Sequence, residues 1–182
     1  MSEEQLKKVM DLFGADFALE AIEDNAMDFD KPIKGGYKAR IDKLTRYSGE
    51  SDKCENGVYD MYSLNLQITE VIEGDEAVNR YVSKTYSNVV GKYQDDAEEG
   101  RRKLMNDLFT GGCKYDIVRE ASTTAEQVVE QVAPQIIDQV VNVRCYPGNT
   151  INKKTKEKNQ IVRIVKEIKP SKPKAEAVAE DW

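Results

Sequence analysis

The clearest alternation of polar and apolar residues in the chain is Met61-Tyr62-Ser63-Leu64-Asn65-Leu66-Gln67-Ile68. Successive side chains of a β-strand point to opposite faces, so this period of two predicts a strand with one buried and one exposed face. Tyr62, Leu64, Leu66 and Ile68 form the buried set. The stretch therefore predicts a half-exposed sheet, to which the neighbouring segments must supply the other strands.

Four further segments have the composition of strands. Residues 37–42 alternate after a Gly-Gly pair, and residues 77–86 are rich in β-branched and aromatic residues after a Glu-Gly-Asp turn. Residues 139–146 and 159–168 form a second pair around the loop 147–158. Short loops favour hairpins, so the chain predicts a three-stranded antiparallel meander followed by a later hairpin.

Helical periodicity appears before and between these strands. Residues 3–13 predict a short N-terminal helix, and residues 95–109 predict a second one that ends at a Gly-Gly pair. Thr123-Thr124-Ala125-Glu126 matches a capping box and begins a third, whose length Pro134 limits. The element order predicts a mainly β fold with inserted helices, namely a five-stranded OB-type barrel with helical material between its third and fourth strands.

Composition divides the chain into three parts. Residues 1–30 form an N-terminal helical segment, 31–169 the OB-fold domain with its helical insertion around 95–138, and 170–182 a tail. The tail contains almost no apolar residues, so we expect it to be a disordered, acidic-aromatic segment. At 182 residues the chain has room for one core.

The net charge of −6 conceals a strong segregation of charge. Residues 1–30 hold two lysines against nine acidic residues, a net −7, whereas residues 139–174 hold ten basic residues against two acidic ones, a net +8. Residues 31–47 form a second basic segment. Two basic segments that share one surface would suit a polyanionic partner, for which an acidic end of the same chain would compete.

Residue usage excludes several classes of function. The chain has no histidine, which removes imidazole-based catalytic triads and zinc sites with imidazole ligands. Cys54, Cys113 and Cys145 form no Cys-x-x-Cys pair, so we interpret them as reduced structural residues. We expect no enzyme activity, metal or cofactor. The sequence shows neither a membrane-spanning stretch nor a signal peptide, so we expect a cytoplasmic protein.

The basic and aromatic residues on or beside the expected strands are the candidate nucleic-acid contacts. Exposed aromatic rings stack on bases, and lysine and arginine neutralise phosphates. The candidates are Lys38, Arg40, Arg46, Tyr47, Tyr59, Tyr81, Lys84, Tyr86, Arg144, Tyr146, Lys153, Lys154, Lys156 and Lys158.

Three segments together carry a resemblance to a known family. Residues 31–41, the strand segment 64–68 and the late hairpin 140–168 resemble phage-encoded OB-fold proteins that bind single-stranded DNA. The resemblance covers roughly residues 31–170. It implies largely sequence-independent binding of single-stranded DNA in phage DNA replication, recombination or repair, within the cytoplasm of the host cell.

The end of the tail adds a second likeness. Glu180-Asp181-Trp182 is similar to the acidic tail with an aromatic end that is common in single-stranded-DNA-binding proteins. The likeness implies that Glu180, Asp181 and Trp182 bind partner proteins of replication or recombination.

Two other functions remain open from the sequence. The chain is alternatively a phage structural or host-interaction protein on a β-barrel scaffold, whose basic loop and tail contact protein. A metal-dependent nuclease would need a carboxylate cluster, for which Asp95, Asp96, Glu98 and Glu99 are the candidates. Acidic residues are also common near a helix N-terminus, which explains this cluster without catalysis.

Overall fold

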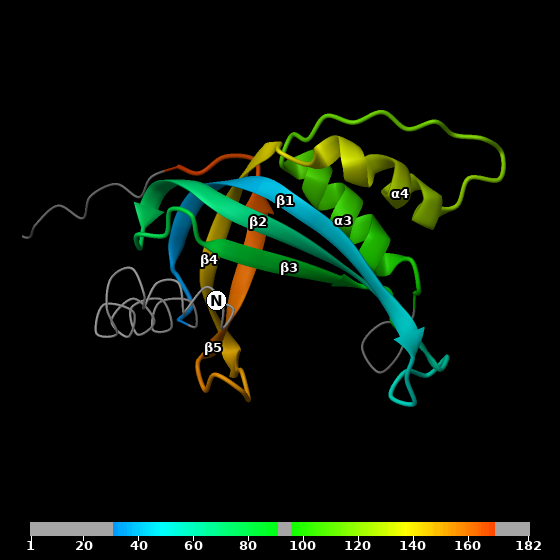
Figure 1. Cartoon of the computed structure of the whole chain (residues 1–182), viewed down its shortest axis with the longest axis horizontal. Helices are drawn as coiled ribbons and strands as arrows, with labels where there is room; N and C mark the ends of the chain where they lie inside the picture. The colour runs from blue at the N-terminus through cyan, green and yellow to red at the C-terminus, as the bar shows by residue number, and fades with distance from the viewer. Residues whose placement is uncertain (1–30, 91–95, 170–182) are drawn as a thin grey trace, which may run out of the picture.

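The computed structural model of the chain describes residues 31–90 and 96–169. Within these ranges five strands form one antiparallel sheet, and two helices accompany it (Figure 1). The strands are β1 (Gly35–Glu50), β2 (Val58–Gly74), β3 (Tyr81–Ser87), β4 (Val140–Ile151) and β5 (Lys158–Val165). Their order in the sheet is β3-β2-β1-β4-β5.

This order places β3 and β5 at the two edges of an open sheet. The mainly β character and the strands expected from the sequence are confirmed, whereas closure into an OB-type barrel stays a prediction. Some strands are longer than the sequence indicated, since β1 continues to Glu50 and β4 continues through Pro147 to Ile151. Others are shorter, since β3 begins only at Tyr81 and β5 ends at Val165. The expected helix at residues 3–13 and the expected disordered tail lie outside the described residues.

Two helices connect β3 to β4. They are α3 (Glu99–Thr110) and α4 (Ala125–Ile136). Leu104 and Leu108 of α3 are buried in the core of the sheet, and α4 packs beside α3 (Figure 1). No helix within the described residues is long and apolar enough to cross a membrane.

The capping box of α4 begins one residue later than the sequence indicated. Thr124 is the N-cap, and its hydroxyl accepts a hydrogen bond from the backbone N–H of Gln127. The Gln127 side chain accepts in return from the backbone N–H of Thr124 at 2.8 Å. Pro134 does not stop the helix, which ends two residues later at Ile136. Proline lacks a backbone N–H and its ring crowds the carbonyl four residues back, which is consistent with the helix ending within the same turn.

A ladder of glutamines attaches the extended segment 114–118 to α4. Gln131, Gln135 and Gln139 each accept a hydrogen bond from one backbone N–H of the segment and donate one to the carbonyl of the same residue. The residues bound are Val118, Asp116 and Lys114. Gln131 and Gln135 lie in α4, where four residues rise about 6 Å, close to the rise of about 6.6 Å of two extended residues. Gln139 continues the ladder just beyond the end of the helix at Ile136.

Strand β1 contains one extra residue, a β-bulge, and after it the side chains that would have faced the core face outward, and the reverse. Ile41 pairs with Leu66 and Lys43 pairs with Asn65, which leaves Asp42 without a partner in β2. Before this bulge Ala39 and Ile41 are buried, whereas after it Leu44 packs on the core. A single-residue shift moves every following side chain to the opposite face. Arg46 therefore points toward the core side and the helices.

Arg46 joins a network of charges between the sheet and the helices. Its Nε donates to Asp60 Oδ1 at 2.8 Å, and its guanidinium also bonds Glu126 of α4. Asp60 Oδ2 accepts from Arg101 of α3, which is 8% exposed, and from the side-chain amide of Asn88 at 3.1 Å. Arg101 Nη1 bonds Glu98 at 2.7 Å. Asp60 is thus an anion shared by strand β1 and helix α3, and Glu126 is another, because its Oε2 lies 3.7 Å from Arg101 Nη2.

The three cysteines are free thiols. Cys145 of β4 is 2% exposed, and burial raises the pKa of its thiol to about 12. A thiol of that pKa stays protonated at neutral pH and packs as a small apolar side chain.

We predict that Asp60→Ala lowers the free energy of unfolding by about 3–5 kcal/mol, because it leaves the buried guanidinium of Arg101 without its main counter-charge. The measurement is urea unfolding at neutral pH. Glu70→Ala is the control, because it removes an ion pair with Lys38 whose side chains are 44% and 55% exposed. This control should change stability by less than about 1 kcal/mol. Equal losses for the two variants would contradict the assignment.

Candidate nucleic-acid interface

The outward side chains of β1, β2 and β3 form a polar surface, which we call the meander face. Cross-strand register arranges it in four rows of three residues, with β1 paired to β2 and β2 to β3. The rows are Arg40–Gln67–Tyr81, Lys43–Asn65–Ser83, Thr45–Ser63–Thr85 and Tyr47–Met61–Ser87. None of the twelve is acidic, and the residues between them in β2 and β3, such as Leu64 and Val82, belong to the core.

Aromatic rings lie at both ends of the meander face. Tyr81 is 52% exposed at one end, and Tyr47 is 50% exposed at the other. Tyr59 lies beyond Tyr47, where its ring covers Gly49 of the paired strand. A Cβ at residue 49 would approach the Tyr59 hydroxyl to 2.7 Å, so glycine makes room for this ring. The surface thus offers exposed rings separated by hydroxyl and amide groups.

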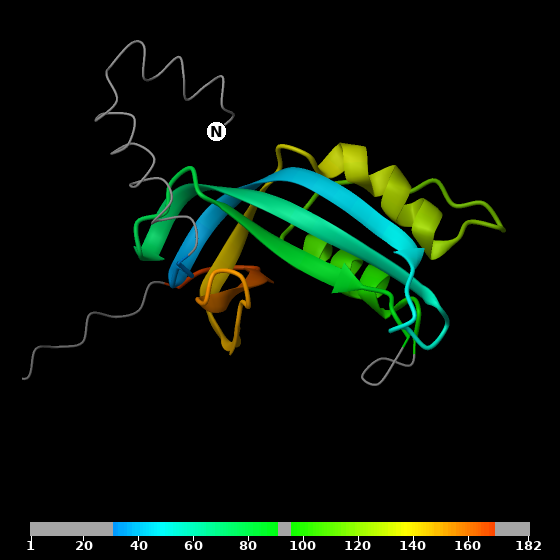
Figure 2. The same cartoon turned by 60° about the horizontal axis from the view of Figure 1, so that its bottom comes forward.

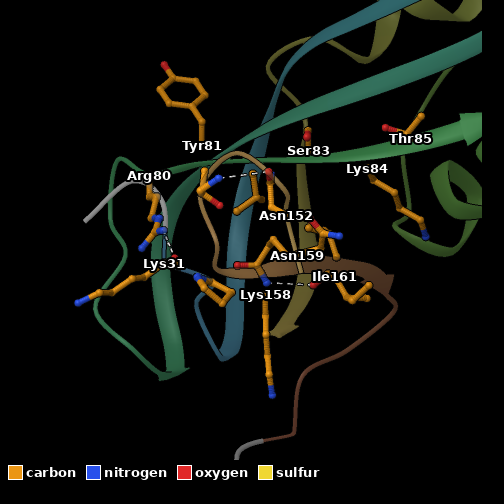
Figure 3. Close-up of a pocket in the computed structure, with 15 residues that line it drawn as sticks. Lys31, Arg80, Tyr81, Ser83, Lys84, Thr85, Asn152, Lys158, Asn159 and Ile161 are labelled. Carbon is orange, nitrogen blue, oxygen red and sulfur yellow. Dashed lines mark hydrogen bonds between the residues drawn. The ribbon is translucent and has the colours of Figure 1, made fainter. Parts of the chain in front are cut away.

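A groove borders the meander face between the edges of β3 and β5; we call it the edge groove (Figure 3). Its volume is about 600 Å³. Four of its lining residues are basic and none is acidic. The basic residues are Lys31, Arg80, Lys84 and Lys158. Uncharged polar residues and the apolar Pro32, Val82, Ile161 and Val162 complete the lining. Lys84 is paired with Asp107, so the positive charge of the groove comes mainly from Lys31, Arg80 and Lys158.

The segment 31–33 crosses one end of the edge groove. The Arg80 guanidinium donates to the backbone carbonyl of Lys31, an interaction drawn in Figure 3. The side-chain amide of Gln160, in β5, accepts from the N–H of Ile33 at 2.7 Å and donates to its carbonyl at 3.1 Å. The chain therefore enters the described part of the protein at the groove.

The β4–β5 turn adds a cluster of cations beside the groove, which we call the basic turn. Lys153, Lys154, Lys156 and Lys158 are all exposed, and none forms an ion pair within residues 31–90 and 96–169. Asn152 shapes the turn, because its side chain accepts from the N–H of Lys154 at 2.9 Å. Figures 1 and 2 show that this turn and the β1–β2 turn lie near opposite ends of β3.

The structure brings several of the sequence-predicted contacts together. Tyr81 and Lys158 line the edge groove, and Arg40 and Tyr47 lie on the meander face. Arg40 is already engaged there, because it donates to Gln67 Oε1 at 2.6 Å and lies 3.3 Å from Asp138.

Three of the predicted contacts, Arg46, Lys84 and Tyr86, connect the sheet to the helices, although Lys84 also lines the edge groove. Arg46 bonds Asp60, and this hydrogen bond, with the carboxylate charges nearby, raises the pKa of the guanidinium. Lys84 bonds Asp107 of α3 at 2.5 Å, and Tyr86 donates to the same carboxylate at 2.7 Å. Tyr86 is only 3% exposed, and burial, followed by the Asp107 charge, raises its phenol pKa. The interpretation of Tyr86 as an exposed stacking ring was wrong.

Lys38, Arg144 and Tyr146 lie on a different part of the sheet, around β4. Lys38 bonds Glu70, and Arg144 bonds Glu73 at 2.7 Å. The guanidinium of Arg163 lies 5.4 Å from the centre of the Tyr146 ring. These residues are engaged within the protein and lie apart from the edge groove. Glu180, Asp181 and Trp182 fall outside the described residues.

Sequence reasoning missed Lys31, Lys43 and Arg80 as members of the candidate surface. Lys31 and Lys43 belong to the basic segment 31–47, so their charge was visible in the sequence. The bulge at Asp42 decides that Lys43, rather than Arg46, faces outward, and no local pattern predicts that bulge.

The acidic residues before and in α3 pair with basic residues of the helix. Asp96 bonds Arg102, Glu98 bonds Arg101 and Glu99 bonds Lys103. Asp95 lies outside the described residues. Among the residues that the structure describes, no group of three or more His, Cys, Asp or Glu is arranged to hold a metal ion.

Comparison of the chain with protein-family models, with curated proteins and with solved structures finds no match.

We predict that Tyr86→Phe lowers the free energy of unfolding by about 1–2 kcal/mol, because it removes a buried hydrogen bond to Asp107. Tyr81→Phe removes the same hydroxyl group from an exposed ring and should change stability by less than about 0.5 kcal/mol. Paired urea unfolding curves provide the comparison. A loss for Tyr81→Phe as large as that for Tyr86→Phe would show that Tyr81 belongs to the core.

Proposed function

We propose that the chain is a non-catalytic protein that binds single-stranded DNA with little sequence preference, for phage DNA replication or recombination. The observation that carries the proposal is a polar face without acidic residues that has an exposed tyrosine at each end, Tyr47 and Tyr81, and borders an electropositive groove at β3. Recruitment of partner proteins through residues 180–182 is part of the proposal and rests on the sequence alone.

Stacking is the first source of affinity. Tyr47 and Tyr81 offer rings to bases, and each stacked base contributes roughly 1–3 kcal/mol. A duplex hides its base faces, so this surface favours single strands. Ser83, Asn65 and their neighbours provide hydroxyl and amide groups that bond any base or sugar, which supports binding without sequence preference.

Phosphate neutralisation is the second source. The basic turn supplies four lysines without ion pairs in the described residues, and the groove supplies further positive charge. Lysines that form no ion pair exchange only water and counterions when they bind a phosphate, so their contribution falls as salt rises.

The strand order supports an OB-type fold for the proposed domain. In such a fold the third and fifth strands close the barrel and helical material lies between the third and fourth strands. The order β3-β2-β1-β4-β5, with α3 and α4 after β3, is compatible with that plan. Ligands of OB-folds bind across the second and third strands, where the meander face lies.

We predict that replacing Lys153, Lys154, Lys156 and Lys158 together by Ala weakens binding to oligothymidylate and flattens its salt dependence. The slope of log affinity against log salt falls by roughly 0.7 for each phosphate that the variant no longer neutralises. Fluorescence anisotropy with a labelled single strand and a duplex of equal length, across a salt series, measures both effects.

The matched control for the basic-turn variant replaces Lys103, Lys114, Lys166 and Lys169, which are exposed elsewhere on the protein. It makes the same change in net charge, so an equal effect of the two variants would mean that only total charge matters. Equal affinity of the unmodified chain for single strand and duplex would refute stacking. Binding that is absent, or insensitive to salt, would favour the structural or host-interaction protein instead.

We predict that Tyr47→Ala and Tyr81→Ala each weaken single-strand binding by about 1–3 kcal/mol and leave the salt slope unchanged, because stacking releases no counterions. Tyr146→Ala is the control, since that ring lies under Arg163 on another part of the sheet. The measurement is the same anisotropy titration. The assignment of the face fails if Tyr146→Ala weakens binding more than Tyr47→Ala and Tyr81→Ala do.

A further inference from the structure

The two exposed tyrosines of the meander face lie far apart in both directions of the sheet. Tyr47 pairs with Met61 and Tyr81 pairs with Gln67, so their rows are six residues apart along β2. Six residues of an antiparallel strand extend about 20 Å, and the two strand spacings from β1 to β3 add about 10 Å across the sheet. The diagonal of the face between the two tyrosines is therefore about 22 Å long.

Each ring is open to a base from the solvent side. Tyr47 and Tyr81 are about half exposed, and Figure 3 shows the Tyr81 ring pointing away from the edge groove. Neighbouring bases of a stacked strand lie only about 3.4 Å apart, so two adjacent bases cannot reach both rings. A strand that uses both rings must therefore place several nucleotides between the two stacked bases.

The surface between the rings offers contacts to the backbone of a strand rather than to its bases. Lys43 lies there, exposed and without an ion pair among the residues that the structure describes, so it can neutralise a phosphate. The other side chains of these rows carry hydroxyl or amide groups, which bond sugar and phosphate oxygens as readily as bases. The two rows are Lys43–Asn65–Ser83 and Thr45–Ser63–Thr85, and none of these six residues has a ring.

We propose that the meander face holds a single strand at two separated bases, one on Tyr47 and one on Tyr81, and that the bases between them contribute little. This inference rests on the proposed function and specifies its ligands. Any strand whose backbone bridges the two rings is a ligand, including one whose intervening bases are missing or chemically altered. A strand too short to bridge the rings gains only one stacking contact.

Abasic strands that carry only two thymines test the separation. Each probe is a labelled decamer with the same number of phosphates, so the ionic contribution to binding is constant. One probe has thymines at nucleotides 2 and 8, about 20 Å apart at the spacing of a stacked strand, and the other has them at nucleotides 5 and 6. In anisotropy titrations of the full chain we expect the separated pair to bind at least about fivefold more tightly, which is the lower limit for one stacked base.

Variants of one ring identify the source of this difference. Tyr47→Ala should abolish the preference for the separated pair, because only one ring then remains, whereas Tyr47→Phe should preserve it. Tyr146→Ala is the matched control and should also preserve it, since that ring lies under Arg163 on another part of the sheet. A preference that survives Tyr47→Ala, or that Tyr146→Ala removes, would overturn the proposal.

An unmodified thymidine decamer measures the contribution of the intervening bases. It should bind less than about tenfold more tightly than the separated pair, because the bases that it adds meet no ring. A larger gain would mean that the whole face recognises bases, which contradicts contact at two points.

The results distinguish this inference from the function on which it rests. If the unmodified chain binds oligothymidylate but binds the two abasic probes equally, contact at two points is rejected and the proposed function stands. If it binds neither oligothymidylate nor the probes, both are rejected.

Discussion

The extra residue at Asp42 is the constraint on which the arrangement of the candidate surface depends. Because β1 pairs with both β2 and β4, its alternation must satisfy two parts of the core with one strand. The bulge lets Ile41 and Leu44 both face inward, and it turns Arg46 toward Asp60 and Lys43 toward solvent. One unpaired residue thus determines which cation stabilises the helices and which is available to a ligand.

The basic residues of the protein fall into two groups: those that pair with carboxylates between the sheet and the helices, and those that are exposed without such partners in the described residues. On the helix side, Asp60 and Asp107 neutralise Arg46, Arg101 and Lys84, so those cations hold α3 and α4 in place. The basic turn carries lysines without such partners in the described residues. A protein with a net charge of −6 can therefore present a positive surface, because its acidic residues are engaged in structural pairs or lie elsewhere in the chain.

Alternation and capping signals were sufficient to predict the strands and the inserted helices, since each depends on neighbouring residues. The Tyr62–Ile68 pattern is buried as the sequence indicated, and α4 has a capping box one residue from the expected position. Side-chain partners were not predictable in this way. Tyr86 and Tyr81 have similar sequence surroundings, yet one bonds Asp107, 21 residues along the chain, and the other faces solvent. They lie an odd number of residues apart in β3, so they face opposite sides of the sheet, and α3 supplies Asp107 on the buried side.

The glutamine ladder has a different kind of consequence, which concerns how this part of the chain tolerates change. Gln131, Gln135 and Gln139 recognise the peptide groups of segment 114–118 and not its side chains. The identities of Lys114, Asp116 and Val118 are therefore nearly free, whereas the length of the segment is not. Insertion of one residue puts every following peptide group out of phase with the helix, and insertion of two restores the match. Sequence diversity is thus well tolerated at these three positions, whereas Tyr115 and Ile117 between them pack against the core, and the length of the segment can change only in steps of two residues.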